Sequence, residues 1–246
     1  MVRIGDSLKD QRVFITQSQA FMGPVLCKCF RDHGAQVIAD ESDPQDVEAF
    51  EAKLRAVTDE GAVDVVIANL AIASPMTRAH QVGDEEWRTV FAALVDPLPR
   101  IARAFLPAMM ARKRGKLLVM GSATALRGQR NISTYAAARG AQLSWVRAVG
   151  VEMAMHQVHV NLIAQNFVEN PTYYSAEVQA LPAFQERLKR EVPLGRLASP
   201  EEDAMFAVFL ASREVNFFLV RHFPLPVVGF SHRAMIGVQD LKSCSK

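Results

Sequence analysis

Short apolar runs alternate with longer segments of helical periodicity along most of this chain, and this alternation restricts the fold more than any other feature. Five runs have the length and composition of buried strands, at residues 12–17, 36–40, 63–69, 116–120 and 158–163. The segments between them predict helices, at residues 21–33, 44–58, 84–112 and 133–156. Strands that alternate with helices form right-handed βαβ units and a parallel sheet. We therefore expect one α/β domain over residues 1–246.

Prolines and capping residues refine the predicted helices. Asp43 and Pro44 are of the types found at an N-cap and a first helical position, so we expect the second helix to begin there. Pro97 and Pro99 must interrupt or kink the longest helical segment, because proline lacks the amide hydrogen that a helix interior needs. Near the end of the chain we expect a turn region at residues 187–196 and a closing helix at residues 200–213.

Composition argues against several classes of function. The chain has 246 residues, 50% of them hydrophobic and 22% charged, with a net charge of +2, which gives no strong case for nucleic acid or membrane binding. No apolar run approaches the roughly 18 residues of a transmembrane helix, and the first residues lack the apolar core of a secretory signal, so we expect a cytoplasmic protein. The three cysteines include no CxxC pair and the six histidines no HExxH spacing, so we expect neither a disulfide framework nor a metal site.

Three polar residues form a candidate proton-transfer site, which we call the catalytic trio: Ser122, Tyr135 and Arg139. Ser122 directly follows a predicted buried strand, whereas Tyr135 and Arg139 are four residues apart in an alanine-rich segment and share one face of a helix. A fixed cation near a phenol favours the phenolate, which can act as a base toward a substrate hydroxyl. The alternative is a hydrogen-bonded serine, a half-buried tyrosine and a solvated arginine without chemistry.

The turn after the first strand, TQSQAFMG at residues 16–23, bears on nucleotide binding. A dinucleotide site needs glycines here, because bare backbone must approach the pyrophosphate. Only Gly23 remains of such a pattern, and Gln17 and Phe21 carry side chains where the pyrophosphate would lie. We therefore expect a filled cofactor site, with Phe21 projecting toward the nicotinamide space. Asp40, where an acidic residue would hold the adenine ribose, is interpreted as a surface or capping residue.

The segment at residues 164–181, AQNFVENPTYYSAEVQAL, follows the last predicted strand and has no clean periodicity. Ligands of open parallel sheets bind beyond the carboxyl ends of the strands, so this aromatic-rich segment could wall a pocket. An ordinary connection is the alternative.

Taken together, these features resemble the short-chain dehydrogenase/reductase superfamily over nearly the whole chain. The matching stretches are DVVIAN at 64–69, LPAMMARKRGKLLVMGS at 106–122 and VPLGRLASPEEDA at 192–204. Tyr135 also lies thirteen residues after Ser122, as in that superfamily.

Departures from the superfamily pattern are similar to those of the halohydrin dehalogenases, a cofactor-independent branch. The usual partner of the tyrosine is a lysine four residues on, and here it is Arg139. The first turn keeps Thr16, Phe21 and Gly23 in place of a glycine-rich pattern. This resemblance implies a single Rossmann-like three-layer α/β/α domain with a parallel doubly wound sheet and no cofactor.

The resemblance also implies a reaction. A vicinal haloalcohol would close to an epoxide with release of halide and a proton, and anions such as azide, cyanide or nitrite would open an epoxide. Tyr135 would take the proton from the substrate hydroxyl, Arg139 would stabilise the phenolate, and Ser122 would donate a hydrogen bond to the substrate oxygen.

An anion pocket opposite Tyr135 follows from the same resemblance. The reductases usually carry a Pro-Gly pair where this chain has Gln165 and Asn166. The residues expected to bind the halide or another nucleophile are Phe21, Gln165, Asn166, Phe167 and Val168. Those expected to line the substrate pocket are Thr16, Leu70, Tyr173 and Tyr174, with the choice between the two tyrosines left open.

The resemblance further implies assembly into an oligomer. Helices at residues 84–112 and 133–156 are apolar on more than one face, and the superfamily usually buries such helices between subunits, so we expect a homotetramer. In the dehalogenases the C-terminal stretch, here VRHFPLPVVGFSHRAMIG at 220–237, can reach the active site of a partner subunit.

Two other hypotheses stand beside the dehalogenase. An atypical NAD(P)-dependent short-chain reductase is supported by the fold and by the pair Ser122 and Tyr135, and it predicts nucleotide binding. A non-catalytic relative predicts a cavity without turnover, and the retained catalytic trio argues against it.

Overall fold

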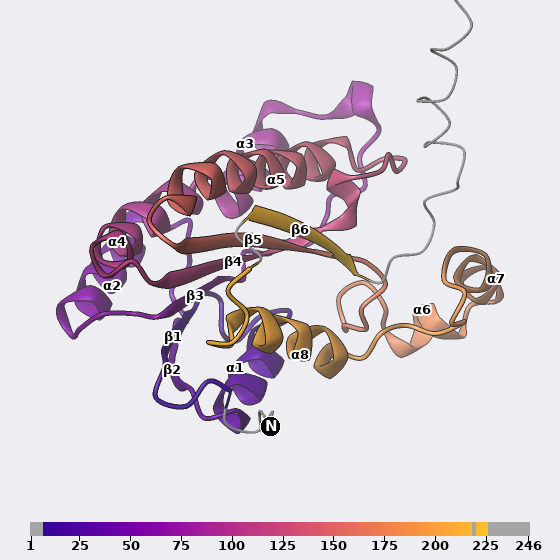
Figure 1. The fold of residues 1–246 in the computed structure, drawn as a ribbon. Helices are drawn as coiled ribbons and strands as arrows, with labels where there is room; N and C mark the ends of the chain where they lie inside the picture. Colours follow the sequence, from indigo (N-terminus) through magenta and orange to yellow (C-terminus); the bar gives the residue numbers. More distant parts are fainter. Residues whose placement is uncertain (1–6, 218–219, 226–246) are drawn as a thin grey trace, which may run out of the picture.

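The computed structural model describes residues 7–217 and 220–225, which form a parallel sheet between two layers of helices (Figure 1). The strands are β1 (Arg12–Ile15), β2 (Gln36–Ala39), β3 (Val65–Ala68), β4 (Gly115–Ser122), β5 (Val158–Gln165) and β6 (Val220–Leu225). Their order across the sheet is β2-β1-β3-β4-β5-β6, so the winding reverses between β1 and β3. The predicted doubly wound α/β fold is therefore confirmed.

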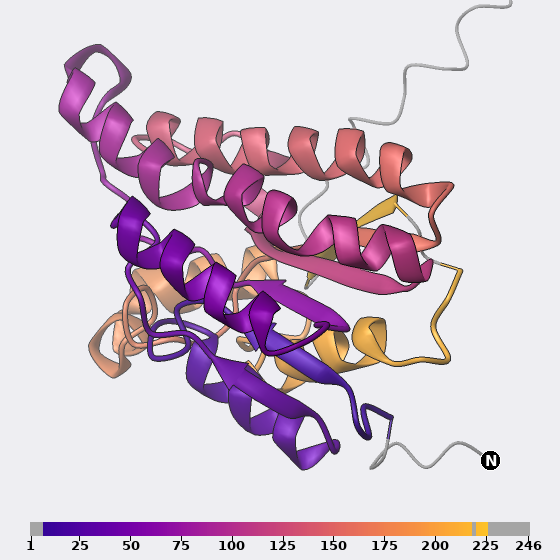
Figure 2. The same ribbon diagram turned by 90° about the vertical axis from the view of Figure 1, so that its left-hand side faces the viewer.

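Helices cover both faces of the sheet (Figures 1 and 2). One face carries α1 (Gly23–Asp32) and α8 (Pro200–Ala211), and the other carries α2 (Val47–Asp59), α3 (Asp84–Leu94), α4 (Pro97–Arg112) and α5 (Ser133–Ala154). Two short helices, α6 (Ala176–Ala180) and α7 (Pro182–Glu191), project beyond the carboxyl ends of the strands (Figure 1). Single turns of 3₁₀ helix occur at η2 (Ala79–Gln81) and η3 (Ala123–Ala125).

The central strands are largely apolar because both faces of the sheet are covered. Every residue of β3 is buried, as are seven of the eight residues of β4. Along β1, Phe14 contacts Phe105 of α4 with ring centroids 5.2 Å apart, whereas Ile15 packs in the opposite core with Leu26 and Phe30 of α1. This alternation fixes β1, and the turn that follows it, between the two helical layers.

The start of α2 differs from the prediction. Its N-cap is Asp46, whose carboxylate accepts a hydrogen bond from the amide of Ala49 at 3.1 Å. Asp43 instead accepts from the amide of Gln45 at 2.9 Å and closes a turn before the helix. The predicted start at Asp43 and Pro44 was wrong because this aspartate forms a local side-chain turn instead.

Prolines divide the long helical segment as predicted. α3 ends at Leu94 and α4 begins at Pro97, so residues 84–112 form two helices. Pro107 is tolerated inside α4.

Three elements near the end of the chain were not predicted. α6, α7 and β6 lie in segments without clear periodicity, and α7 extends into residues 187–191 of the predicted turn region. β6 contains Pro224, and a proline in the sequence argues against a strand. It is tolerated here because β6 is at the edge of the sheet among the described residues, with a neighbouring strand on one side only. Residues 226–237 of the C-terminal stretch lie outside the described residues.

The carboxyl ends of the central strands meet at one edge of the sheet. Ser122 and Gln165 are register partners at the ends of β4 and β5, so two residues from distant parts of the sequence lie side by side. Among the described residues, no helix has the length and apolar character needed to cross a bilayer.

Candidate active site

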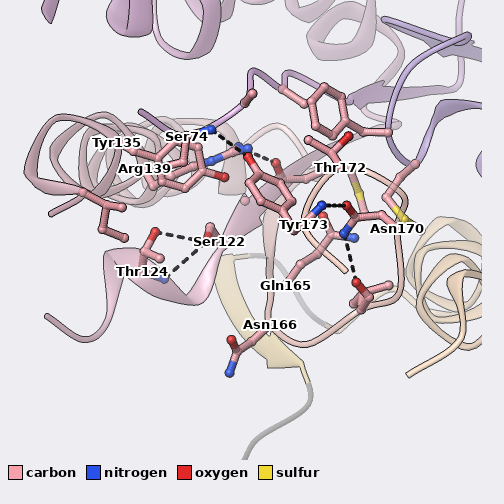
Figure 3. Close-up of a pocket in the computed structure, with 18 of the residues that line it drawn as sticks. Ser74, Ser122, Thr124, Tyr135, Arg139, Gln165, Asn166, Asn170, Thr172 and Tyr173 are labelled. Atoms are coloured by element: carbon pink, nitrogen blue, oxygen red, sulfur yellow. Dashed lines mark hydrogen bonds between the residues drawn. The ribbon is translucent and has the colours of Figure 1, made fainter. Parts of the chain in front are cut away.

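A cavity of about 480 Å³ opens at the carboxyl ends of the strands (Figure 3). Its lining comes from the β1–α1 turn, the segment after β3, the end of β4, α5, the segment after β5 and α7. The volume falls in the range of small-molecule sites. Among the described residues that line it, the charged side chains are those of Arg139 and Arg187, and none is acidic.

Ser122 ends β4 and faces this cavity. Its Oγ accepts hydrogen bonds from the amide and the hydroxyl of Thr124 at 3.3 and 3.0 Å (Figure 3). A serine hydroxyl has one hydrogen to donate, and these two bonds do not use it. Thr124 therefore fixes the Ser122 oxygen and leaves its hydrogen available to a ligand oxygen.

Tyr135 and Arg139 lie one turn apart on α5 and are both buried. The guanidinium carbon of Arg139 is 5.0 Å from the centroid of the Tyr135 ring. Its Nη1 donates to the carbonyl oxygens of Leu70 and Met120 at 3.1 and 2.9 Å, and to Oε1 of Gln142 at 2.9 Å. The arginine thus holds the ring of the tyrosine against the ends of β3 and β4. Its expected support of a phenolate stays a prediction.

Tyr173 brings a second phenol to the trio (Figure 3). Its hydroxyl donates to the carbonyl oxygen of Ile72 at 2.9 Å and accepts from the amide of Ser74 at 3.1 Å. Burial raises the pKa of Tyr173 well above its ordinary value, and the neighbouring Tyr135 raises it further. Tyr173 is therefore a neutral phenol near Tyr135, with its hydrogen donated to Ile72.

The β1–α1 turn has positive φ angles at positions that carry side chains larger than glycine. Gln17 and Phe21 have φ angles of 44° and 50°, in the left-handed region that residues with a Cβ rarely adopt. A Cβ added to Gly23 would lie 2.3 Å from the carbonyl oxygen of Gln17, which accounts for the glycine at this position. The chain thus has side chains at two strained positions of a turn that glycines would occupy without strain.

Both of these side chains occupy the space inside the turn. Oε1 of Gln17 accepts from the amide of Ala71 at 2.7 Å. Asn69 donates from Nδ2 to the carbonyl oxygens of Gln17 and Ala20 at 3.1 and 3.2 Å. Phe21 lines the cavity, with its ring centroid 6.3 Å from that of Tyr173. Hydrogen bonds and ring contacts therefore hold the filled turn in place.

The residues at this turn do not fit a nicotinamide dinucleotide. Gln17 crosses the turn to Ala71, and Phe21 lines the cavity that holds Tyr135, so both positions carry side chains where a pyrophosphate needs close approach to the backbone. Asp40 is 1% exposed, and its Oδ1 accepts from the amide and the hydroxyl of Ser42 at 3.1 and 2.6 Å. Of the two interpretations, a surface or a capping residue, the surface one was wrong, because the carboxyl is buried and accepts local hydrogen bonds from Ser42. Burial raises its pKa.

The end of β5 and the segment after it form part of the wall of the cavity. Gln165, Asn166, Phe167 and Val168 all line the cavity. Phe167 has a φ of 54°, so this wall includes a strained backbone position of the kind that gathers at functional sites. Figure 3 shows the side chain of Asn166 directed away from the trio.

Asp203 on α8 holds Gln165 from behind the cavity. Nε2 of Gln165 donates to Oδ2 of Asp203 at 2.5 Å, while Oδ1 is buried without a hydrogen-bond partner. Burial raises the pKa of Asp203 to about 6, and the bond from Gln165 opposes this shift. Asp203 was missed, although an acidic residue on a helix face that buries Ala204 and Ala207 was a visible signal.

Arginine side chains at the mouth of the cavity were also missed. The guanidinium carbons of Arg127 and Arg187 lie 5.6 and 5.4 Å from the centroid of the Phe167 ring. Nη2 of Arg127 donates to Oδ1 of Asn166 at 3.2 Å. No sequence signal singled out these arginines, because they come from two segments without a motif.

Most predicted site residues come together in this cavity. The trio, the five expected halide-binding residues, Leu70 and both tyrosines line it, whereas their roles stay predictions. Tyr173 lies beside Tyr135, and Tyr174 packs against Phe167 and Phe184 at ring distances of 6.1 and 5.6 Å. Thr16 does not line the cavity. It is fully buried directly after β1, and its amide donates a hydrogen bond to the carbonyl oxygen of Ile67. Its predicted place in the pocket was therefore wrong.

The fold is a doubly wound α/β domain whose cavity holds a serine at the end of β4 and a tyrosine on α5. Residues 12–220 match the sequence model of a family described as enoyl-(acyl carrier protein) reductase. The chain belongs to this family, which lies within the short-chain dehydrogenase/reductase superfamily of enzymes.

Curated relatives are reductases and dehydrogenases. A 3-oxoacyl-(acyl-carrier-protein) reductase from Vibrio harveyi is 32% identical over 177 residues, which cover 70% of this chain and 69% of that protein. A cis-4-hydroxycyclohexanecarboxylate dehydrogenase from Sinomonas cyclohexanicum is 29% identical over 194 residues, which cover 78% of this chain and 76% of that protein.

Solved structures of two kinds share the fold. A halohydrin dehalogenase bound to ethyl (2S)-oxiran-2-ylacetate superposes with a TM-score of 0.79 at 24% identity, covering 89% of this chain and 98% of that one. A gluconate 5-dehydrogenase from Burkholderia cenocepacia in complex with NADP and tartrate superposes with a TM-score of 0.81 at 21% identity, covering 90% and 96%. At these identities the likeness concerns the fold alone.

Proposed function

We propose that this member of the superfamily is a halohydrin dehalogenase that works without a nucleotide. The observation that carries the proposal is the β1–α1 turn. Gln17 and Phe21 occupy it with side chains at strained backbone positions, and Phe21 lines the same cavity as Ser122 and Tyr135. A site that retains the proton-transfer residues but has lost its nucleotide cradle needs chemistry that transfers no hydride.

The proposed reaction is an internal displacement. A vicinal haloalcohol binds with its hydroxyl between Ser122 and Tyr135, and the phenolate of Tyr135 takes the hydroxyl proton. The alkoxide oxygen forms a bond to the neighbouring carbon while the carbon–halogen bond breaks, and the halide leaves with the bonding electrons. The products are an epoxide, a halide ion and one proton, which passes from Tyr135 to solvent.

The geometry of the site supports both binding of the substrate oxygen and departure of the halide. Ser122 has a hydrogen to donate to the substrate oxygen, because Thr124 supplies both bonds that its oxygen accepts. The wall at residues 165–168, together with Phe21, supplies a partly apolar surface for a large, weakly hydrated leaving group. In reverse, the same surface would hold azide, cyanide or nitrite for attack on an epoxide.

The substitution Tyr135→Phe tests the proposed base. We expect it to lower kcat for bromide release from 1-bromo-2-propanol by roughly a hundredfold or more, because general-base catalysis contributes at least that factor. Initial rates by ion chromatography measure the effect. An unchanged thermal unfolding midpoint serves as the control for folding, and full activity in Tyr135→Phe would exclude this base.

A second candidate function is a nucleotide-dependent short-chain reductase. The family match and the relatives at 29–32% identity favour this candidate more strongly than they favour the dehalogenase. It predicts saturable binding of NADH or NADPH by the wild-type protein and oxidation of the bound nucleotide by a carbonyl substrate. Isothermal titration with each nucleotide separates the two candidates, and we expect no binding.

A further inference from the structure

The mouth of the cavity beside α7 carries an excess of positive charge. Arg127, Arg187 and Arg190 all form ion pairs with Glu191, at 3.6, 3.2 and 3.1 Å. Three guanidinium groups thus share one carboxylate, and this cluster keeps a formal surplus of two positive charges. Burial raises the pKa of Glu191, but the arginines outweigh this effect and lower it. The carboxylate is therefore ionised, and the surplus of two positive charges includes its negative charge.

Arg187 is the member of this cluster that lines the cavity. Its Nε donates to Oε1 of Glu191 at 3.2 Å, and the structure shows no acceptor for its two terminal nitrogens among the described residues. Glu191 and the ring of Phe167 hold the guanidinium in place, and its side chain is 36% exposed. Arg187 therefore offers two oriented donors to a ligand without first losing an internal partner.

The other cation of the cavity, Arg139, is less accessible to a ligand, although its buried Nε has no hydrogen-bond partner among the described residues. Arg139 is 5% exposed, and its Nη1 is bonded to Leu70, Met120 and Gln142. No acidic side chain lines the described part of the cavity, and Glu191, which pairs with Nε of Arg187, is shared with Arg127 and Arg190. A cavity of about 480 Å³ also has more room than a three-carbon haloalcohol needs.

We propose that Arg187 binds a carboxylate of the substrate, so that the preferred substrates are haloalcohols and epoxides that carry a carboxylate on the carbon chain beyond the hydroxyl. This inference rests on the proposed function for the reacting end of the substrate. A planar guanidinium matches a carboxylate with two parallel hydrogen bonds, which are strong because both partners are charged. Arg127 acts as a positioning residue through Glu191 and Asn166.

A pair of substrates that differ only in charge tests this proposal. We compare 4-chloro-3-hydroxybutanoate with its amide, 4-chloro-3-hydroxybutanamide, by chloride release. We expect kcat/KM for the acid to exceed that for the amide by roughly ten- to a hundredfold, because a charge-assisted pair is lost with the amide. Most of the difference should lie in KM, since the carboxylate is remote from the bonds that change.

Variants of two neighbouring arginines identify the residue responsible. Arg187→Gln should bring the acid-to-amide ratio of kcat/KM close to one, and Arg187→Lys should restore part of it. Arg190→Gln is the matched control, because Arg190 contacts the same Glu191 but lies outside the cavity with a side chain 71% exposed. It should keep the wild-type ratio. A wild-type ratio near one, or a ratio unchanged in Arg187→Gln, would overturn the proposal.

A non-reactive ligand separates failure of this inference from failure of the proposed function. We expect 3-hydroxybutanoate to bind the wild-type protein in isothermal titration, and Arg187→Gln to weaken that binding roughly tenfold or more. If this holds while neither chloro compound reacts, the carboxylate site stands and the dehalogenase function falls. If both chloro compounds react equally and 3-hydroxybutanoate does not bind, the function stands and the carboxylate site falls.

Discussion

At the scale of single residues, the buried carboxyl of Asp203 links stability to pH. Its pKa is about 6 in the folded protein against 3.8 as its ordinary value, because burial disfavours the charged form. Between these two values the folded state binds more protons than the unfolded state, so this group makes stability fall as pH rises from about 4 to 6. Above pH 6 the whole cost is present, about 3 kcal/mol by the size of the shift.

Replacing that carboxyl with an amide should stabilise the protein at neutral and alkaline pH. Asp203→Asn keeps an acceptor for Nε2 of Gln165 and removes the buried charge. We expect its free energy of unfolding to exceed that of the wild type at pH 8 by up to about 3 kcal/mol, and by about half as much at pH 5. Urea denaturation at the two pH values measures this.

The control for that substitution is Glu201→Gln, on the same helix at an exposed position, which should change little at either pH. A gain from Asp203→Asn that is the same at pH 5 and pH 8 would contradict the assignment of the cost to ionisation.

Sequence reasoning reached those site residues that belong to local patterns. The four-residue spacing of Tyr135 and Arg139 placed them on one helix face, and the apolar run before Ser122 placed it at a strand end. Arg187 and Asp203 could not be found in this way, because their partners Glu191, Phe167 and Gln165 depend on how α7, α8 and the segment after β5 pack together.

At the scale of elements, the β1–α1 turn decides between the two candidate functions. Its backbone already has positive φ angles at residues 17 and 21, which is the conformation that glycine adopts without strain. The double substitution of Gln17→Gly and Phe21→Gly removes the side chains and leaves that conformation allowed. We expect the variant to bind NADH or NADPH measurably where the wild type does not, with titration calorimetry as the readout.

The single variant Gln17→Gly and the wild-type protein are the comparisons for that experiment. Gln17→Gly alone leaves Phe21 in the cavity and should gain less affinity than the double variant. Nucleotide binding by the wild type as strong as that of the double variant would show that neither side chain obstructs the site.

Elements with strong periodicity were predictable and those in the last third were less so. Burial on both faces makes β1, β3, β4 and β5 predominantly apolar, and prolines marked the break between α3 and α4. The start of α2 depended on whether Asp43 or Asp46 caps the helix, a local competition between two equivalent side chains. α6, α7 and β6 depend on tertiary contacts, because their own segments carry weak patterns.

At the scale of the whole molecule, apolar side chains remain exposed on the layer formed by α3 and α5. Val151 and Met155 are 71% and 79% exposed, and Trp87 is 45% exposed while it stacks on Phe91. Exposed apolar side chains on a helical layer can mark a protein–protein interface. We propose that this layer packs against other copies of the chain in a homotetramer.

Light scattering after size exclusion tests that assembly. We expect a mass of four protomers of 27.2 kDa for the wild type, and a smaller species for Val151→Glu, because a buried charge at an interface is costly. Glu48→Gln, at an exposed position on α2, is the control and should leave the mass unchanged. A wild-type protein that elutes as a stable monomer would remove the proposal.

Release of halide by nucleotide-free protein is the most direct measurement of the function we propose. The protein is purified, stripped of any bound nucleotide, and incubated with 1-bromo-2-propanol while bromide and acid are recorded together. We predict one bromide and one proton per molecule converted, at a rate that added NADH or NADPH does not change. No release from several vicinal bromoalcohols, or release that requires a nucleotide, would contradict the assignment.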